Sequence, residues 1–488
     1  MNSQSQEWSL RIEAVNLDHS VYDTHDISTI RGGSFMLLEV VNKLHEKIPA
    51  LQPEVTGASV GLFLFSCRDE NEKEKILGDV ETELEKQTGQ FATFVYACQP
   101  LPEKDEFAET EQRLTAECHW QQYQTLSFVL PESPAKNKWV ECEMNGVRPA
   151  DDTIDRSNGA VVVSGAVKER FDKGRELRDE LYRKLLGETE LPEMKNIQFT
   201  SDLESLASKT DGGATNEKIA LIHLDGNKFG TIRAKKCYKI EDFKEFNNVV
   251  QKGIQESALK RLLTFALQPE RVGFRTKNNE VRLETLMWGG DEIELIVPAS
   301  QLWDTLKIFF EVASSSKPFK ENPLTYSAGV VVCRHSVPIL QIRRYAEQLC
   351  SIAKAASDGA PSNQFALLNM ASFDAIYKNV GTFLNAYHHP ATTKDFIVPF
   401  SSMSELRQNI RTIRKNFPKN KLYEIVAELK AEKDIEKIVD RALKMISNPL
   451  KESTQKAIHA TTASNPNKWF LISDLWSLVD DTTHEPAI

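Results

Sequence analysis

The sequence predicts an α/β protein in which one domain occurs twice and a helical region follows. Two strand-like runs, LRIEAVNLD at 10–18 and KIALIHLD at 218–225, both end in Leu-Asp and open the two copies. Each copy then has a tight-turn signature before a second apolar run, and helical periodicity dominates the C-terminal part. We place the two copies at residues 7–135 and 218–370 and the helical domain at 371–488.

Composition and charge narrow the class of protein. With 488 residues, 41% hydrophobic and 27% charged, the chain is long enough for two to four ordinary globular domains. A net charge of −10 argues against a protein that mainly coats nucleic acid, so direct nucleic-acid binding is only a weak expectation. We find no membrane-spanning apolar run or signal peptide, and the seven scattered cysteines indicate reduced core thiols. We therefore expect a cytoplasmic protein that binds no membrane.

The first copy looks degenerate when the two are aligned on their Leu-Asp ends. Asp18 then matches Asp225, and the turn Thr56-Gly57-Ala58-Ser59 matches Gly289-Gly290-Asp291-Glu292. The same alignment pairs Tyr22 with Phe229, Thr24 with Thr231, and the strand at 94–98 with that at 330–333. Because Ala58 and Ser59 replace the two acids, we expect no catalytic metal pair in this copy.

The second copy gathers three carboxylates. Asp225 ends an apolar strand, and Gly289-Gly290 forms a tight turn that places Asp291 and Glu292 at a hairpin tip beside it. Converging carboxylates repel one another, and hard oxygen ligands suit Mg²⁺ or Mn²⁺. Magnesium on carboxylates typically holds nucleoside triphosphates, and paired metals promote in-line attack on phosphorus. Gly-Gly-Asp alone is an ordinary turn, but its combination with the strand ending in Asp225 favours the functional interpretation.

Basic and glycine-rich segments flank both copies of the strand. Lys228, Arg233, Lys235 and Lys236 follow Asp225 and suit triphosphate binding, although a solvated helix start is nearly as plausible for each. In the first copy, 28–34 leads into a predicted helix at 35–44. Glycines at a helix start expose N–H groups to an anion, with Arg31 and Ser34 beside it. The alternative is that Ser28 or Thr29 caps the helix and the glycines allow close packing.

The segment 136–217 is predicted to join the two copies. Cys142 begins a zinc-knuckle-like motif, but Asn145 stands where a second cysteine is needed, so we expect a metal-free remnant. The charged helix at about 168–186 is expected to be a solvated brace, and 201–217 a linker. In the second copy, apolar spacing predicts a core-facing helix at 339–356 that carries Lys354 near its end. Further helices are expected at 404–417, 422–431, 435–446 and around 469–476.

The stretch 219–298 resembles the palms of GGDEF-type nucleotide cyclases and, more closely, those of the large polymerase/cyclase subunit of type III CRISPR effector complexes. The resemblance implies two ferredoxin-like palms that face each other. It implies metal ligation by Asp225 and Asp291, with Glu292 standing where the CRISPR subunit usually has Asp and GGDEF enzymes have Glu. Ala353-Lys354 matches a helix end whose lysine touches phosphates, and the Arg-Gly-Gly-Ser stretch at 31–34 matches one that faces a second nucleotide.

From residues and resemblance together we assign two sets. The metal set is Asp225, Gly226, Asp291 and Glu292, with Asp225, Asp291 and Glu292 catalytic. The nucleotide-binding set is Gly226, Asn227, Lys228, Phe229, Gly289, Gly290, Lys354, Arg31, Gly32, Gly33 and Ser34. No convincing side-chain general base is visible, so a metal would have to lower the pKa of the attacking hydroxyl.

The activity that the resemblance implies is metal-dependent nucleotidyl transfer from ATP, with a cyclic oligoadenylate-type second messenger of antiviral defence as product. One alternative is a non-catalytic, nucleotide-binding subunit of an RNA-guided complex, with guide-RNA effector subunits as partners. Another is a GGDEF-like cyclase that uses GTP. His25-Asp26 is only a dipeptide, so we expect no HD nuclease domain of the kind that many of those CRISPR subunits carry ahead of the first palm.

Overall fold

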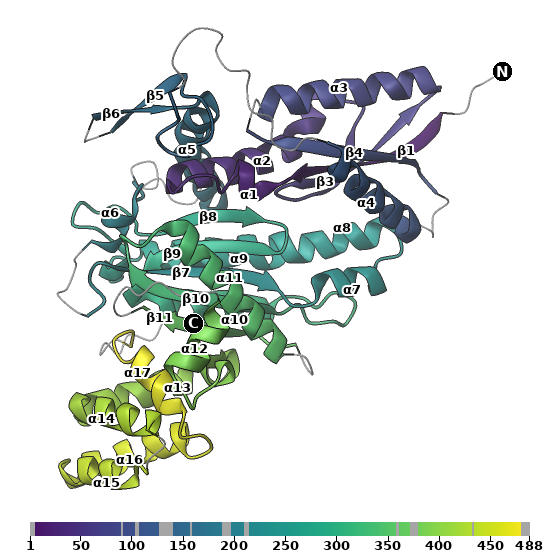
Figure 1. Cartoon of the computed structure of the whole chain (residues 1–488). Coiled ribbons are helices and arrows are strands. Elements are labelled where there is room, and N and C mark those ends of the chain that lie inside the picture. Colours follow the sequence, from purple (N-terminus) through teal and green to yellow (C-terminus); the bar gives the residue numbers. More distant parts are fainter. Residues whose placement is uncertain are drawn as a thin grey trace.

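The computed structural model stacks two α/β domains and a helical domain in one row (Figure 1). It describes residues 5–88, 91–102, 107–125, 140–156, 159–187, 197–208, 214–357, 361–370, 379–431 and 434–479. The predicted boundaries at 135 and 371, and part of the predicted linker, lie outside these residues. Among the described residues no helix is long and apolar enough to cross a membrane. All seven cysteines are free thiols and six of them are buried, as predicted.

The first palm, residues 6–124, is a four-stranded sheet in the order β2-β3-β1-β4, in which β1 runs antiparallel to both β3 and β4. Its strands are β1 (Gln6–Val15), β2 (Gln52–Thr56), β3 (Val60–Cys67) and β4 (Thr93–Pro100). Its helices are α1 (Leu17–Ser20), α2 (Ile27–Lys47), α3 (Glu70–Thr88) and α4 (Phe107–Gln124). Apolar residues of α2 and α3 pack on one face of the sheet, and α4 covers the other. This is the ferredoxin-like arrangement that was predicted.

The second palm repeats that strand order and extends it, as β12-β11-β10-β7-β9-β8. Its strands are β7 (Lys218–Gly226), β8 (Glu284–Gly289), β9 (Glu292–Pro298), β10 (Tyr326–Arg334), β11 (Gln364–Asn369) and β12 (Ile397–Pro399). Its helices are α7 (Phe229–Lys236), α8 (Ile240–Asn248), η2 (Val249–Glu256), α9 (Ser257–Leu267), η3 (Val272–Phe274), η4 (Ala299–Gln301), α10 (Leu302–Ser315) and α11 (Ile339–Ala356). Because β12 pairs with β11, this sheet continues past the predicted boundary at residue 370.

Strand register corrects the predicted alignment of the two palms. In β1 it is Glu13 that lies opposite Val60, as Asp225 of β7 lies opposite Glu292. Three residues after each acid, Asn16 (φ 58°) and Lys228 (φ 59°) adopt the left-handed conformation and begin a helix. Asp18 therefore lies inside α1, and its predicted match to Asp225 is wrong. The Leu-Asp pair misled the alignment because in the first palm it belongs to the helix.

Strand register also shifts the equivalence of the two hairpins by one residue. The first hairpin closes with Gly57 N–H donating to Val60 (2.7 Å), and the second with Gly289 opposite Glu292. Ser59 thus occupies the place of Asp291, and Val60 that of Glu292. The conclusion that the first palm lacks both hairpin acids survives this correction.

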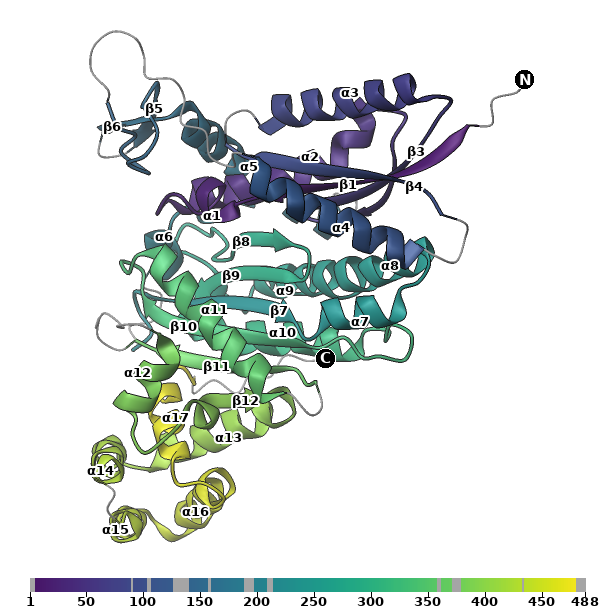
Figure 2. The same ribbon diagram turned by 45° about the vertical axis from the view of Figure 1, so that its right-hand side comes forward.

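A buried ion-pair cluster joins the palms through the middle segment. This segment consists of β5 (Asp152–Arg156), β6 (Gly159–Val163), α5 (Gly165–Leu186) and α6 (Leu203–Ala207). Glu284 of β8 is fully buried and accepts from Arg31 of α2 (2.5 Å) and Arg178 of α5 (2.9 Å). Arg170 of α5 is also fully buried and pairs with Asp23 (2.8 Å). The helix is a brace, as predicted, because it holds α2 beside the edge strand of the second palm (Figure 2). The prediction that its face is solvated holds for Arg175 and Arg183 but is wrong for the buried Arg170 and Arg178.

The predicted zinc-knuckle remnant is a small apolar cluster. Cys142 is fully buried against Ile154, Val163 and Val167. Asn145 donates to Asp23 (3.0 Å) and accepts from the backbone N–H of Val147 and Arg148. The second cysteine position of the motif therefore holds a side chain that stabilises the turn through hydrogen bonds.

The C-terminal domain is helical, as predicted. It contains α12 (Val380–Tyr387), η5 (Thr393–Phe396), α13 (Phe400–Asn416), α14 (Lys419–Lys430), α15 (Glu436–Lys444), α16 (Asn448–Thr462) and α17 (Lys468–Leu475). Helix α17 docks through Trp469, Phe470 and Leu471, all almost fully buried. Helix α16 was missed because Pro449 was interpreted as a break, whereas it lies in the first turn, where proline is tolerated.

Candidate active site

The candidate site lies on the face of the second sheet that α11 covers. Asp225 and His223 are two residues apart on β7, so both side chains point to this face. Glu292 and Glu294 of β9 lie directly opposite them. Lys354, near the end of α11, forms an ion pair with Asp225. The structure thus brings Asp225, Glu292 and Lys354 together, as predicted.

Electrostatics at this edge favour a bound cation. Burial raises the pKa of Asp291, and the charge of Asp225 raises it further, while Lys354 and Arg233 act in the opposite direction. Burial likewise raises the pKa of Glu292; His223 opposes this, and Asp225 and Asp291 add to it. Burial is the main cause of both shifts, and the excess of negative charge from the neighbouring carboxylates adds to it. A divalent ion with oxygen ligands would relieve that excess.

Backbone conformation and close packing explain the two glycines of the second palm's hairpin. Gly289 (φ 155°) and Gly290 (φ 61°) both have backbone conformations that favour glycine. A Cβ on Gly289 would lie 1.8 Å from the Cβ of Ala58, at the tip of the first palm's hairpin. The two hairpin tips therefore touch, which fixes Asp291 at the boundary between the palms.

One helix braces both tips. Within η2, where the backbone widens to π-helical hydrogen bonding, Gln251 donates to the carbonyl of Thr56 (2.7 Å). One turn later Gln255 donates to the carbonyl of Gly290 (3.0 Å). The two bonds tie the turns of both palms to a single element.

The residues after Asp225 support the turn. Asn227 is buried and donates to Thr325 (3.0 Å) and Ser362 (3.1 Å), and it accepts from Ser327 (2.8 Å). Phe229 packs edge-to-face against Tyr326, and a Cβ on Gly226 would lie 2.4 Å from the Phe229 ring. Lys228 begins α7. Nucleotide contact by these four residues stays a prediction; the side chains of Asn227 and Phe229 have packing roles.

The predicted helix start at Phe35 is wrong. Helix α2 begins at Ile27, with Asp26 as its cap, because the Asp26 carboxylate accepts from Thr29 N–H (2.8 Å). The N–H groups of Gly32, Gly33 and Ser34 are thus inside the helix, where they are used in its own hydrogen bonds. The predicted anion site at this helix start therefore has no free N–H groups.

Close packing, the alternative interpretation, explains these glycines. A Cβ on Gly32 would lie 1.8 Å from the carbonyl oxygen of Arg170 in α5. Arg31 is fully buried in its pair with Glu284, and Ser34 accepts from Trp288 N–H of β8 (3.4 Å). Contact between the segment 31–34 and a second nucleotide stays a prediction, and this geometry does not favour it.

Sequence reasoning missed a buried polar chain beside the carboxylates. Glu294, fully buried, lies 3.0 Å from His223 and 2.8 Å from Arg343 of α11, which also pairs with Glu347 (2.8 Å). The ring of Tyr22, from the first palm, lies 3.5 Å from the Arg343 guanidinium. Burial lowers the pKa of His223, but the hydrogen bond and charge of Glu294, with the charges of Glu292 and Glu347, raise it above its ordinary value. The signal was present: His223 and Glu294 share the alternation of Asp225 and Glu292 in otherwise apolar strands.

Solved structures with the same fold contain Csm1. A Csm1–Csm4 cassette in complex with cA4 matches with a TM-score of 0.57 at 11% identity, covering 98% of this chain and 70% of that one. Csm1 from T. onnurineus matches with a TM-score of 0.57 at 12% identity, covering 98% and 69%. A Csm1–Csm4 subcomplex of the type III-A CRISPR-Csm interference complex matches with a TM-score of 0.53 at 10% identity, covering 97% and 69%.

The fold is that of Csm1 subunits.

This agrees with the resemblance seen in the second palm's motifs. No protein-family model matches the chain, and no curated protein does. At these identities the likeness to Csm1 extends over nearly the whole chain but concerns the fold.

Proposed function

We propose that the protein is a metal-dependent nucleotidyltransferase that makes cyclic oligoadenylates from ATP. The observation that carries this proposal is the convergence of Asp225, Asp291 and Glu292, half-buried at one sheet edge, with the pKa values of the two hairpin acids raised. Their carboxylates, with the carbonyl of Gly226, would hold Mg²⁺ or Mn²⁺. When bound, the cation lowers the pKa of the attacking hydroxyl and neutralises phosphate charge.

The reaction joins two nucleotides at this edge. The 3′-hydroxyl of one ATP attacks the α-phosphorus of another: a new P–O bond forms, the bond from the α-phosphorus to the bridging oxygen of the β-phosphate breaks, pyrophosphate leaves, and the hydroxyl proton passes to solvent. The same step within one oligomer closes the ring. Lys354 already faces Asp225 across the site, so its ammonium can contact the triphosphate once a cation neutralises that carboxylate. The contact between the hairpins fixes the acids against the other palm, where the acceptor nucleotide would lie.

Similar folds support the choice of ATP and of the product. Csm1–Csm4 cassettes with this fold were solved with cA4, with cA3 and with one ATP. Assembly of this chain with effector-complex subunits, and a role in antiviral defence, are part of the same proposal.

One observation favours a non-catalytic alternative. Arg31, the cation predicted to face a second nucleotide, is fully buried in an ion pair with Glu284. A subunit that binds one nucleotide without turnover would fit this arrangement. A cyclase that uses GTP is a further alternative, and the triphosphate assay below distinguishes both from the main proposal.

The test is incubation with each triphosphate and Mn²⁺, followed by mass spectrometry of the products. We expect a cyclic oligoadenylate from ATP, and we expect EDTA to stop its formation and added Mn²⁺ to restore it. Asp291→Ala should lower the rate by about 100-fold or more, because it removes a metal ligand. Ser59→Ala, at the equivalent place in the first palm, is the control. Undiminished turnover of Asp291→Ala would refute the site.

A further inference from the structure

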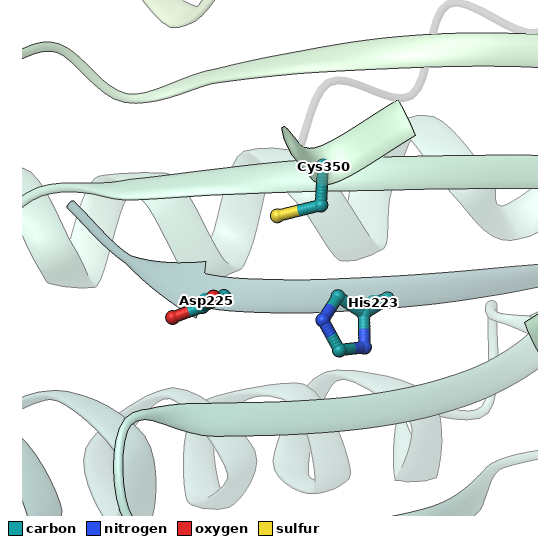
Figure 3. A group of neighbouring side chains, drawn as sticks. All are labelled: His223, Asp225 and Cys350. Atoms are coloured by element: carbon teal, nitrogen blue, oxygen red, sulfur yellow. The ribbon is translucent and has the colours of Figure 1, made fainter. Parts of the chain in front are cut away.

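A mixed set of nitrogen, oxygen and sulfur donors lies beside the carboxylates. Figure 3 shows His223 and Asp225 along β7, with Cys350 of α11 across from them. One potential ligand atom from each lies within 4.8 Å of the others. His223 and Cys350 are 4% and 2% exposed, so solvent does not compete strongly for them.

The surroundings of His223 point independently to a metal. Its Nδ1 lies 3.0 Å from Glu294, a fully buried carboxylate that Arg343 holds in place (2.8 Å). A histidine that ligates a metal usually donates its other ring N–H to such a carboxylate, which fixes the tautomer and the ring orientation. Glu294 therefore places the proton on Nδ1 and leaves Nε2 as the ligating atom.

The donor types select the metal. Imidazole and thiolate are poor ligands for Mg²⁺ but preferred ones for Zn²⁺. The Cys350 thiol donates to the carbonyl of Ser327 (3.3 Å). A hard cation would leave that thiol protonated, whereas a soft dication exchanges for its proton.

We propose that His223, Asp225 and Cys350 form a zinc site that overlaps the candidate magnesium site through Asp225. Zinc would replace the Cys350 proton, which passes to solvent, and the thiolate and carboxylate together would neutralise the dication. Lys354 would leave Asp225. Zinc donors lie about 2.0–2.3 Å from the ion, so the three side chains close in by about 1 Å. Zinc binding at this site does not depend on the proposed function. The competition of Zn²⁺ with Mg²⁺ for Asp225 does rest on the proposed function.

Cobalt is the probe, because its spectrum reports thiolate ligation. Metal-free full-length protein is titrated with Co²⁺, and we expect one equivalent to produce a thiolate-to-cobalt charge-transfer band that Zn²⁺ then removes. Cys350→Ser should lose the band and bind Co²⁺ at least ten-fold more weakly. Cys333→Ser, at the far end of β10, and Cys142→Ser, in the knuckle remnant, are matched controls that should keep it.

A second measurement needs no variant. X-ray absorption of the zinc-loaded wild type should show one sulfur and at least one imidazole around the ion. A band that disappears in Cys142→Ser, or a zinc shell without sulfur, would overturn the proposal. Cobalt binding without turnover of any triphosphate would refute the proposed function and leave the zinc site standing. Turnover of a triphosphate without the cobalt band would overturn the zinc site and leave the proposed function standing.

Discussion

The two palms have the same strand order but balance their charges differently. Glu13 and Asp225 occupy the same place on the first strand, and Ser59 and Asp291 the same place in the hairpin. In the first palm, Arg11 lies 3.3 Å from Glu13 and 3.4 Å from Glu111 of α4. Arg233, from the second palm, lies 3.6 Å from the same Glu111.

The corresponding edge of the second palm gathers more acids. Among the residues that the structure describes, Asp225, Asp291 and Glu292 share this edge, and Lys354 pairs with Asp225. Burial raises the pKa values of Asp291 and Glu292, and the charges of the neighbouring carboxylates raise them further. Arginine side chains supply the counter-charge in the first palm, and we propose that a bound cation supplies it in the second.

The largest effect is expected on the free energy of unfolding, when the buried ion-pair cluster between the palms is broken. Glu284→Ala removes the buried carboxylate, so that the fully buried Arg31 loses its ion pair while Arg178 keeps only Asp179 as an acidic partner among the described residues. Breaking such a pair typically costs about 3–5 kcal/mol, so the free energy of unfolding should fall by about that amount. Urea denaturation followed by circular dichroism measures it.

The matched control is an exposed carboxylate in an ion pair. Glu452, on α16, pairs with Lys456 at the surface, and Glu452→Ala should leave the unfolding midpoint almost unchanged. Equal midpoints for the two variants would mean that the Glu284 cluster does not hold the palms together.

A smaller effect tests the charge balance of the first palm. Arg11→Ala removes the cation between Glu13 and Glu111, which should lower the free energy of unfolding by about 1 kcal/mol. Mg²⁺ should then raise the melting temperature of this variant more than that of the wild type, because an acidic pair becomes available. Arg113→Ala, on the exposed side of α4, is the control. No additional response to Mg²⁺ would contradict the idea that Arg11 stands in for a metal.

The smallest effect is a pH dependence of the second palm. Asp291 and Glu292 have raised pKa values when folded, so the folded state binds more protons than the unfolded state. Without metal, stability should therefore fall as pH rises from the ordinary carboxyl range through the raised values, by about a few tenths of a kcal/mol per pH unit. Asp291→Asn should flatten this slope, and Mg²⁺ should too. A wild-type slope identical to that of Asp291→Asn would contradict the assignment.

Local sequence patterns correctly predicted helices and strands that bury one face. The helix at 339–356 has its predicted bounds, because apolar residues repeat along one side and are buried there. The second hairpin was predicted because only glycine suits its turn. Asp225, Glu292 and Lys354 meet as expected, since strand alternation and helix position fix them.

The errors arose where contacts distant in sequence decide. Gly32 suggested a helix start, but it lies inside α2, and it is glycine because the α5 backbone crosses there. A Cβ on Gly174 of α5 would in turn lie 2.2 Å from the carbonyl oxygen of Ser28. The charged surface of α5 hid two arginines that pair with carboxylates elsewhere in the chain. Nothing local distinguishes Leu17-Asp18, at a helix start, from Leu224-Asp225, at a strand end.

The most direct test compares Asp225→Asn with Glu13→Gln, two isosteric changes at equivalent positions. Each purified variant is incubated with ATP and Mn²⁺, and the cyclic product is quantified by mass spectrometry. The account predicts a loss of about 100-fold or more for Asp225→Asn and a rate within about three-fold of wild type for Glu13→Gln. Equal losses in both variants, or a loss confined to Glu13→Gln, would contradict the claim that the second palm alone holds the catalytic cation.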